Sequence, residues 1–382
     1  MSDGSQGPGG FDFEQILRMF RSEGPLNFDV AKQVAAWVAA QAEGGPAAVA
    51  DQELTAALTD LTRTAQLHVT EMSGLGADLP PTAQVLGRVE WAHATLEGLR
   101  PVLTVLAERM AAGPEGTEAE PTGDLAGADI GGLITAMAPM LLGVQAGFMI
   151  GHLSPLTLSR YEMPMPLDVE PAVVFVGPNV TAFEEDWSLP RDEFRFYLAL
   201  TEVAHAAVQS APWVRRQLVD RGLAFASAFE VDPNAVQAQL GDFDPMDPST
   251  FQSAVADPVE FLGAIRTPRQ QAAMAELQLT TAVVEDYADF VVERVGRRLI
   301  TEFDRIREAC HRHRVERGEA ARFLEALLGV QADPEPHGFC EGVAEREGPD
   351  ALRRLWEDER FFPTRAEFEA PGLWLARIDL PE

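Results

Sequence analysis

The stretch Phe194–Ala207, FRFYLALTEVAHAA, decides the fold of this chain. Its aromatic and aliphatic side chains recur at spacings of three and four residues, which predicts a buried helix. Thr201, Ala204 and His205 fall on the same stripe, within the segment TEVAH at residues 201–205. This segment is one residue away from H-E-x-x-H, the motif that places two imidazoles and a general base over one zinc ion. The helix is therefore a metal site, the remnant of one, or neither.

The composition of the chain is strongly acidic. Among 382 residues there are 60 Asp and Glu but only 30 Lys and Arg, so the formal net charge is −30. Nucleic acids and anionic membranes are polyanions, and a charge of this sign argues against both as partners. Apolar residues make up 46% of the chain, which is enough for a sizeable core in one large domain or two.

The compartment is predicted from cysteine usage and from the start of the chain. Cys310 and Cys340 form neither a CxxC motif nor a disulfide framework. No basic region followed by an apolar one opens the chain, so we expect no secretory signal and a cytoplasmic protein. Residues 130–159 carry no Asp, Glu, Lys or Arg and are long enough to span a membrane. Their repeated glycines favour close helix packing inside a protein instead.

The pattern along the chain predicts a mainly α protein in two parts. Residues 1–10 are expected to be a flexible tail, and residues 11–112 carry apolar side chains at helical spacing, including 47–75 and 82–112, which predicts an N-terminal helical bundle. The segment at 113–129 is rich in Gly, Pro and acidic residues and is the predicted linker. Residues 130–382 are expected to form the second, larger domain, with a small β-sheet.

Few strands are expected in that second domain. Ala172–Val176, AVVFV, is the clearest strand, and Gly177-Pro178-Asn179 after it predicts a turn. Residues 184–188 are expected to be an acidic loop. Residues 271–300 predict a long amphipathic helix, and residues 302–317 a charged helix whose outer face is solvated.

A zinc peptidase needs three protein ligands and one open position for water. In the TEVAH segment, Glu202 stands where the general base would stand and His205 where the second histidine ligand would stand. Thr201 replaces the first ligand, and a neutral hydroxyl binds zinc less well than an imidazole. Glu285 is the predicted third ligand, and Asp289, one helical turn further on, could orient a histidine.

A structural interpretation competes with the metal site. A glutamate and a histidine one turn apart on a helix commonly form a hydrogen-bonded pair without any metal. A different donor could also replace the missing ligand. The sequence does not place the candidates near His205; they are His152, His311, His313 and His337.

Several segments, taken in order, resemble the zincin-like metallopeptidase family of actinobacteria and their relatives. GPLNFD at 24–29 is similar to the family's N-terminal signature, and LSRYE at 158–162 stands where the family has Leu-Gly-x-Tyr-Asp. TEVAH follows, and EDYAD at 285–289 resembles the segment E-G-x-A-D. FPT at 362–364 and PGLWLAR at 371–377 resemble the closing motifs, so the likeness spans nearly the whole chain.

The resemblance implies a zincin-like fold and a hydrolase of the metallopeptidase type that acts on a peptide or protein. It implies that His205 and Glu285 are zinc ligands and that Glu202 is the general base. The first histidine of the family maps to Thr201, so that role is not carried over. We therefore expect a degenerate site that binds zinc weakly or not at all. The alternatives are a pseudo-peptidase that binds a peptide or protein without cleaving it, and a helical scaffold.

Overall fold

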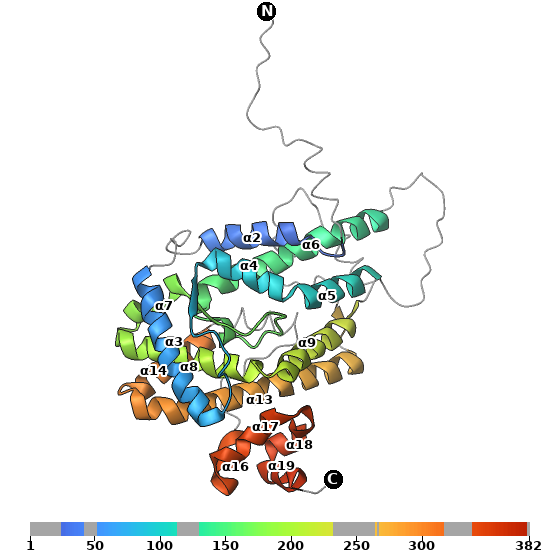
Figure 1. Cartoon of the computed structure of the whole chain (residues 1–382). Helices are drawn as coiled ribbons and strands as arrows, with labels where there is room; N and C mark the ends of the chain where they lie inside the picture. The colour runs from blue at the N-terminus through green and yellow to red at the C-terminus, as the bar shows by residue number, and fades with distance from the viewer. Residues whose placement is uncertain are drawn as a thin grey trace, which may run out of the picture.

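The computed structural model describes residues 24–41, 52–112, 130–231, 264–265, 267–316 and 338–379. Within these ranges the protein is mainly α, as predicted (Figure 1). The predicted tail at 1–10 and linker at 113–129 lie outside the described residues. The longer helices are α2 (Phe28–Gln41), α3 (Gln52–Ser73), α4 (Arg88–Gly98), α5 (Arg100–Ala112), α6 (Ile130–Leu153), α7 (Gly177–Asp186), α8 (Arg191–Gln209), α9 (Pro212–Ser227), α13 (Pro268–Leu299) and α14 (Phe303–Glu316).

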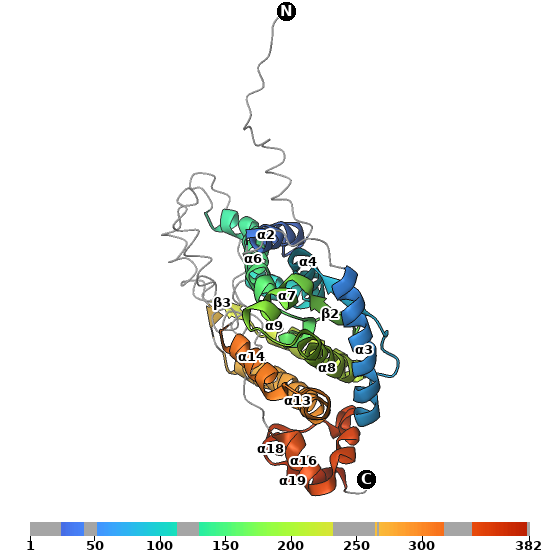
Figure 2. The same ribbon diagram turned by 90° about the vertical axis from the view of Figure 1, so that its left-hand side faces the viewer.

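Helix α8 contains the stretch on which the fold depends. All residues from Phe196 to Val208 are buried, which confirms the predicted buried helix. It packs against α3 and α13, and Figure 2 shows these three helices side by side. Helix α14 also contacts α8. A helix that is covered on several sides needs apolar side chains all round, or polar ones whose hydrogen bonds are made inside the protein. Thr201, Glu202 and His205 are the buried polar side chains of α8.

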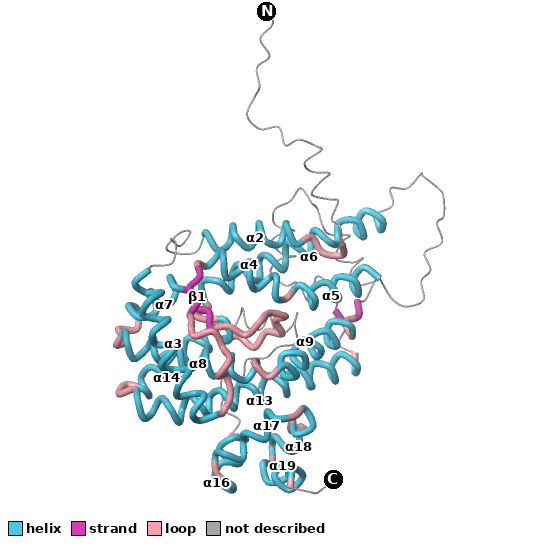
Figure 3. Tube along the Cα trace, in the orientation of Figure 1, coloured by secondary structure: helices cyan, strands magenta, loops and turns pink. Residues whose placement is uncertain are grey.

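The strands are short and few among the described residues (Figure 3). The strand predicted at Ala172–Val176 is confirmed as β2 (Val173–Val176), whose four residues are all buried. It pairs in parallel with β1 (Ala83–Leu86), with Ala83 opposite Val173. The prediction of continuous helix over 82–112 is therefore wrong at β1. Strands β3 (Glu230–Val231) and β4 (Ala264–Ile265) form a second, antiparallel pair.

The turn predicted after β2 is wrong, because helix α7 begins there. Pro178 occupies the first turn of α7, where its missing N–H costs no hydrogen bond. The predicted acidic loop at 184–188 is also helical over its first three residues, at the end of α7. Glu184 is buried, and its two carboxylate oxygens accept hydrogen bonds from Nε and Nη2 of Arg195 at 2.6 and 2.9 Å. The ion pair between Glu184 and Arg195 therefore connects α7 to α8.

The uncharged stretch that begins at residue 130 forms α6, which packs closely against α2. Gly143, Gly147 and Gly151 lie at intervals of four residues. A Cβ atom on Gly143 would lie 2.5 Å from the carbonyl oxygen of Asn27, and one on Gly151 would lie 2.7 Å from Cβ of Val38. This bears out the predicted close packing. Across the part of the chain that the structure describes, no helix combines the length and apolar character needed to cross a membrane.

The C-terminal part of the chain is a group of short helices below α13 (Figure 1). Asp286 of α13 is buried, and its carboxylate accepts hydrogen bonds from the backbone N–H groups of Gly338 and Cys340, both at 2.8 Å. It thereby satisfies free donors at the start of α16. The elements of this group are α16 (Phe339–Glu347), η3 (Pro349–Arg353), α17 (Arg354–Glu357), η4 (Glu359–Phe361), α18 (Arg365–Glu369) and α19 (Pro371–Ile378).

Helices from both sides of the predicted linker share one hydrophobic core. Leu58 and Val69 of α3 belong to the same buried cluster as Phe194 of α8 and Val283 of α13. The β1–β2 pair crosses the same boundary. The division at 113–129 stays a prediction, but it does not separate two independent cores among the described residues.

Candidate functional site

The carboxylate of Glu202 is fully buried and bonded to the backbone of two neighbouring segments. Its Oε1 accepts the N–H of Tyr161 at 2.8 Å, and its Oε2 accepts the N–H of Val174 at 3.4 Å. Burial raises the pKa of Glu202 to about 7, against the effect of hydrogen bonds from Ser159 and these backbone groups. Glu202 therefore connects α8 by hydrogen bonds to β2 and to the short 3-10 helix η2 (Arg160–Glu162).

The imidazole of His205 is buried one helical turn after Thr201. Its Nδ1 lies 2.9 Å from the carbonyl oxygen of Thr201. A carbonyl can only accept, so Nδ1 carries the proton and Nε2 keeps its lone pair in the neutral ring. Burial lowers the pKa of His205, which keeps the ring neutral at pH 7. The ring stacks on Tyr161, with centroids 5.8 Å apart and planes 9° apart. This is the form of histidine that can bind a metal through Nε2.

Thr201 occupies the position of the missing first histidine. Its hydroxyl donates a hydrogen bond to the carbonyl oxygen of Tyr197 at 3.0 Å, one turn earlier in α8. This bond orients the hydroxyl along the helix backbone. Thr201 is buried, and it brings neither the charge nor the nitrogen donor that zinc prefers.

Glu285 and Asp289 lie one turn apart on α13, and both are half-buried. Residues four apart share a helix face. The charge of Asp289 acts on His205, where it opposes the effect of burial, so this face of α13 is oriented toward α8. A zinc site with ligands from both TEVAH and EDYAD requires α8 and α13 to be in contact, and they are. The ligand roles of His205 and Glu285 stay predictions.

The candidate replacement histidines have other surroundings. His152 is exposed on α6 and stacks on Phe148, with centroids 5.8 Å apart. Nε2 of His313 lies 2.8 Å from the carbonyl oxygen of Leu156 and therefore donates to it. His311 lies half-buried on α14. His337 lies outside the described residues.

The residues around His205 do not fit a three-ligand zinc site. Glu202 uses both carboxylate oxygens for backbone N–H groups, and Thr201 replaces the first imidazole. Within the described ranges, no group of three His, Cys, Asp or Glu side chains is arranged to hold a metal ion. The arrangement instead gives one neutral imidazole at His205, one buried carboxyl group at Glu202 that is hydrogen-bonded to the backbone, and two half-buried acids on the facing helix, Glu285 and Asp289.

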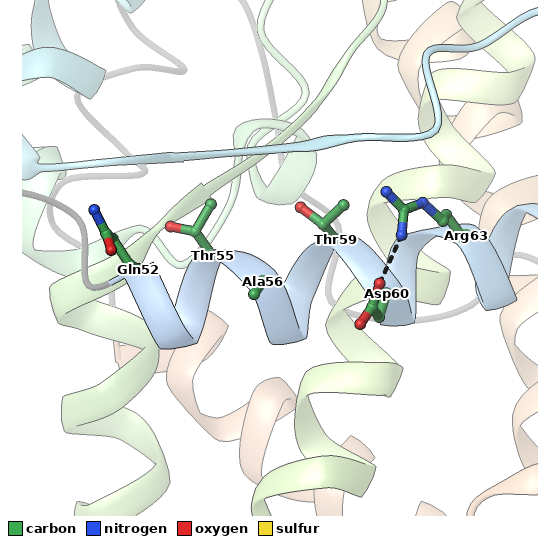
Figure 4. Close-up of a pocket in the computed structure, with 6 residues that line it drawn as sticks. All are labelled: Gln52, Thr55, Ala56, Thr59, Asp60 and Arg63. Atoms are coloured by element: carbon green, nitrogen blue, oxygen red, sulfur yellow. Dashed lines mark hydrogen bonds and ion pairs between the residues drawn. The ribbon is translucent and has the colours of Figure 1, made fainter.

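A surface hollow of about 340 Å³ lies elsewhere, along helix α3 (Figure 4). Its lining includes an ion pair in which Arg63 donates to Asp60 at 2.7 Å. None of the predicted site residues lines it. The lining residues are Gln52, Thr55, Ala56, Thr59, Asp60 and Arg63.

Sequence reasoning missed Tyr161 and Arg314 as neighbours of the candidate site. Tyr161 lies in the LSRYE segment, which served only as a marker of resemblance, although its ring covers His205. Arg314 belongs to α14, whose charge pattern predicted a solvated face, yet its charge acts on His205. Both residues are far from TEVAH in the sequence, so no local spacing could reveal them.

Comparison with known proteins gives the family of this chain. A family model described as zincin-like metallopeptidase matches residues 26–375. Among solved structures, the chain resembles one described as the crystal structure of a putative hydrolase with a novel fold from Chloroflexus aurantiacus. The TM-score is 0.65 at 19% identity, over 94% of this chain and 100% of the other, which shows a shared fold. A search of curated proteins finds no match. Because the family model covers most of its length, this chain belongs to the zincin-like metallopeptidase family.

Proposed function

We propose that this chain, a member of a family of metallopeptidase-like hydrolases, has a degenerate zinc site and binds a peptide or protein segment without zinc-dependent cleavage. The observation that carries the proposal is the position of Glu202. A general base for metal-bound water must reach that water and exchange a proton with it. Both carboxylate oxygens of Glu202 face backbone N–H groups in a fully buried position.

The ligand set supports the same proposal. A structural or catalytic zinc ion takes three or four protein ligands. Position 201 carries a threonine, so another residue would have to complete a conventional zinc site. Within the described ranges, no group of three His, Cys, Asp or Glu side chains is arranged to do so. Proteins commonly keep a fold after losing the catalytic activity associated with it, because activity depends on the residues of the site rather than on the fold. Peptides are the ligands we propose because they are the substrates that the name of the family implies.

One observation favours a second candidate, residual hydrolysis at the same site. His205 keeps the neutral form with Nδ1 bonded to the backbone and Nε2 bearing the lone pair. A single imidazole of this kind could still act as a general base. This candidate requires cleavage that disappears in His205→Ala.

The test combines metal analysis with a peptide assay on the full-length chain. The protein is purified without chelator, its zinc content is measured by mass spectrometry, and it is incubated with a mixed peptide library. We expect far less than one zinc per chain and peptide retention without new cleavage products. Stoichiometric zinc that is lost in His205→Ala, together with chelator-sensitive cleavage, would overturn the proposal.

A further inference from the structure

The outer side of the α2–α6 pair carries exposed aromatic side chains. Trp37 of α2 is 59% exposed, and its ring meets that of Phe148 of α6 at 70°, with centroids 6.2 Å apart. His152, which is also exposed, stacks on Phe148. Both helices contact α4, and Figures 1 and 2 show the pair along one end of the molecule. Among the large hydrophobic residues that are exposed in the described part of the chain, Trp37 is the one aromatic residue.

Trp37 and Phe148 belong to a larger apolar surface, which we call the outer face. Val30, Val34 and Trp37 lie at positions i, i+4 and i+7 of α2 and therefore share one side of that helix. Cβ of Val34 would lie 2.8 Å from a Cβ atom on Gly147, so this row of side chains borders α6 next to Phe148. A contiguous apolar surface of this kind marks a docking site. The outer face consists of Val30, Val34, Trp37, Val144 and Phe148, of which all but Trp37 are half-buried.

The sequence carries a matching apolar stripe shortly before α2. Phe13, Ile16, Leu17 and Phe20 recur at i, i+3, i+4 and i+7, which is the spacing of one face of a helix. These residues lie outside the described ranges, so the stripe is a prediction from the sequence. The polar residues between them fall on other sides of the predicted helix; they are Glu14, Gln15 and Arg18. An amphipathic helix of this kind needs an apolar surface to pack against.

The length of chain between the stripe and α2 brings the two within reach. Three residues separate Phe20 from Gly24, where the described part of the chain begins, and α2 starts at Phe28. A tether this short gives the segment a high effective concentration at the outer face, which a separate molecule does not have. Phe13 to Phe20 and Val30 to Trp37 each span seven steps along the chain, or roughly 10 Å of helix, so the two apolar rows have equal lengths.

We infer that residues 11–20 form an amphipathic helix that docks antiparallel to α2 on the outer face, with Phe20 near Val30 and Phe13 near Trp37 and Phe148. The segment thereby covers the exposed aromatic rings and holds α2 against α6. A second copy of the chain is the competing occupant. The formal net charge of −30 makes two copies repel each other, whereas the tethered segment approaches without that cost. The inference is independent of the function proposed for α8.

Hydrogen exchange of the full-length chain, followed by mass spectrometry, tests the contact. We expect the amides of α2 to exchange about tenfold faster in the variant Ile16→Ser with Leu17→Ser, because the covering apolar side chains are lost. The matched control, Glu14→Ser with Arg18→Ser, changes the polar side of the same segment and should leave the exchange rates unaltered. In a Trp37→Ser background the first variant should have a much smaller effect, since the contact is already broken. Equal exchange in the unaltered protein and the Ile16→Ser, Leu17→Ser variant would overturn the inference.

Photocrosslinking identifies the occupant without disturbing the core. A photoreactive benzoylphenylalanine replaces Phe13, and the adduct is located by mass spectrometry. We expect a crosslink within one chain, to residues 34–37 of α2 or 144–148 of α6. A crosslink between two chains, or a dimer in sedimentation that dissociates in Trp37→Ser, would show that a second copy covers the outer face and would overturn the inference. A crosslink to any other helix would overturn it as well.

Discussion

Glu202 is a carboxyl group that stabilises the fold by hydrogen bonding while remaining difficult to ionise. Its partners include Ser159 and the backbone N–H groups of Tyr161 and Val174. Burial has the larger effect on its pKa, raising it from 4.5 to about 7. In the zincin motif this position would carry the base. Here the same glutamate joins α8 to η2 and to β2, so it has a structural role beside Thr201.

The raised pKa predicts a stability that falls as the pH rises from about 4.5 to 7. The unfolded chain ionises Glu202 first, while the folded chain retains the proton, so the unfolded state gains stability relative to the folded state across this window. A shift from 4.5 to about 7 corresponds to about 3 kcal/mol. Urea unfolding at pH 5 and pH 8 measures it.

The control for the pH experiment is Glu202→Gln, which cannot ionise. We expect the variant to show a smaller loss of stability between pH 5 and pH 8 than the unaltered protein. The difference isolates Glu202 from other groups, including His205, whose lowered pKa acts in the opposite direction by destabilising the fold below about pH 6.5. An equal pH dependence in both proteins would refute the buried carboxyl group described here.

At the scale of elements, the contact between α2 and α6 depends on glycine. A Cβ atom at Gly147 would collide with the carbonyl oxygen of Ala31 and with the side chain of Val34. Because backbone atoms cannot move aside as side chains do, Gly147→Ala should force the helices apart and cost about 1–3 kcal/mol. Thermal unfolding measures the change. Gly372→Ala is the matched control, since a Cβ there would meet nothing closer than 3.9 Å; an equal loss in both variants would contradict the packing argument.

The start of α16 depends on a side chain from another helix. Asp286 accepts the N–H groups of Gly338 and Cys340 from its place on α13. Asp286→Ala leaves two donors without an acceptor, so we expect a loss of about 1–3 kcal/mol and faster hydrogen exchange in residues 338–347. Glu345→Gln, an exposed change on α16, should have little effect. Unchanged exchange in Asp286→Ala would show that the carboxylate does not hold the helix in place.

At the scale of the whole molecule, helix α3 and strand β1 depend on later elements of the chain. The buried residues of α3 belong to the same core as those of α8 and α13, and β1 has its partner in β2. A fragment of residues 11–112 should therefore show no cooperative unfolding transition by circular dichroism, although its helices have the right periodicity. A sharp transition in the isolated fragment would favour the independent bundle that the sequence predicts.

Sequence periodicity was sufficient to predict secondary structure where a segment is long and apolar. It predicted α8 and α13, and the run of Val and Phe predicted β2. It failed at β1, because a four-residue strand between helices gains its stability from a partner about ninety residues away. It failed at α7, because Pro178 is equally suited to a turn and to the first turn of a helix. Two partners of Glu202 are the backbone N–H groups of Tyr161 and Val174, which leave no signature in a sequence.

The central claim is that α8 keeps Glu202 and His205 of the zincin motif but does not hold a zinc ion. The zinc content of the protein is its most direct test. Unaltered protein, Thr201→His and His205→Ala are dialysed against one zinc solution and then against metal-free buffer, and the zinc retained per chain is compared. We predict that the unaltered protein and His205→Ala retain equally little zinc, and that Thr201→His retains more. One zinc per chain in the unaltered protein, lost in His205→Ala, would contradict the account.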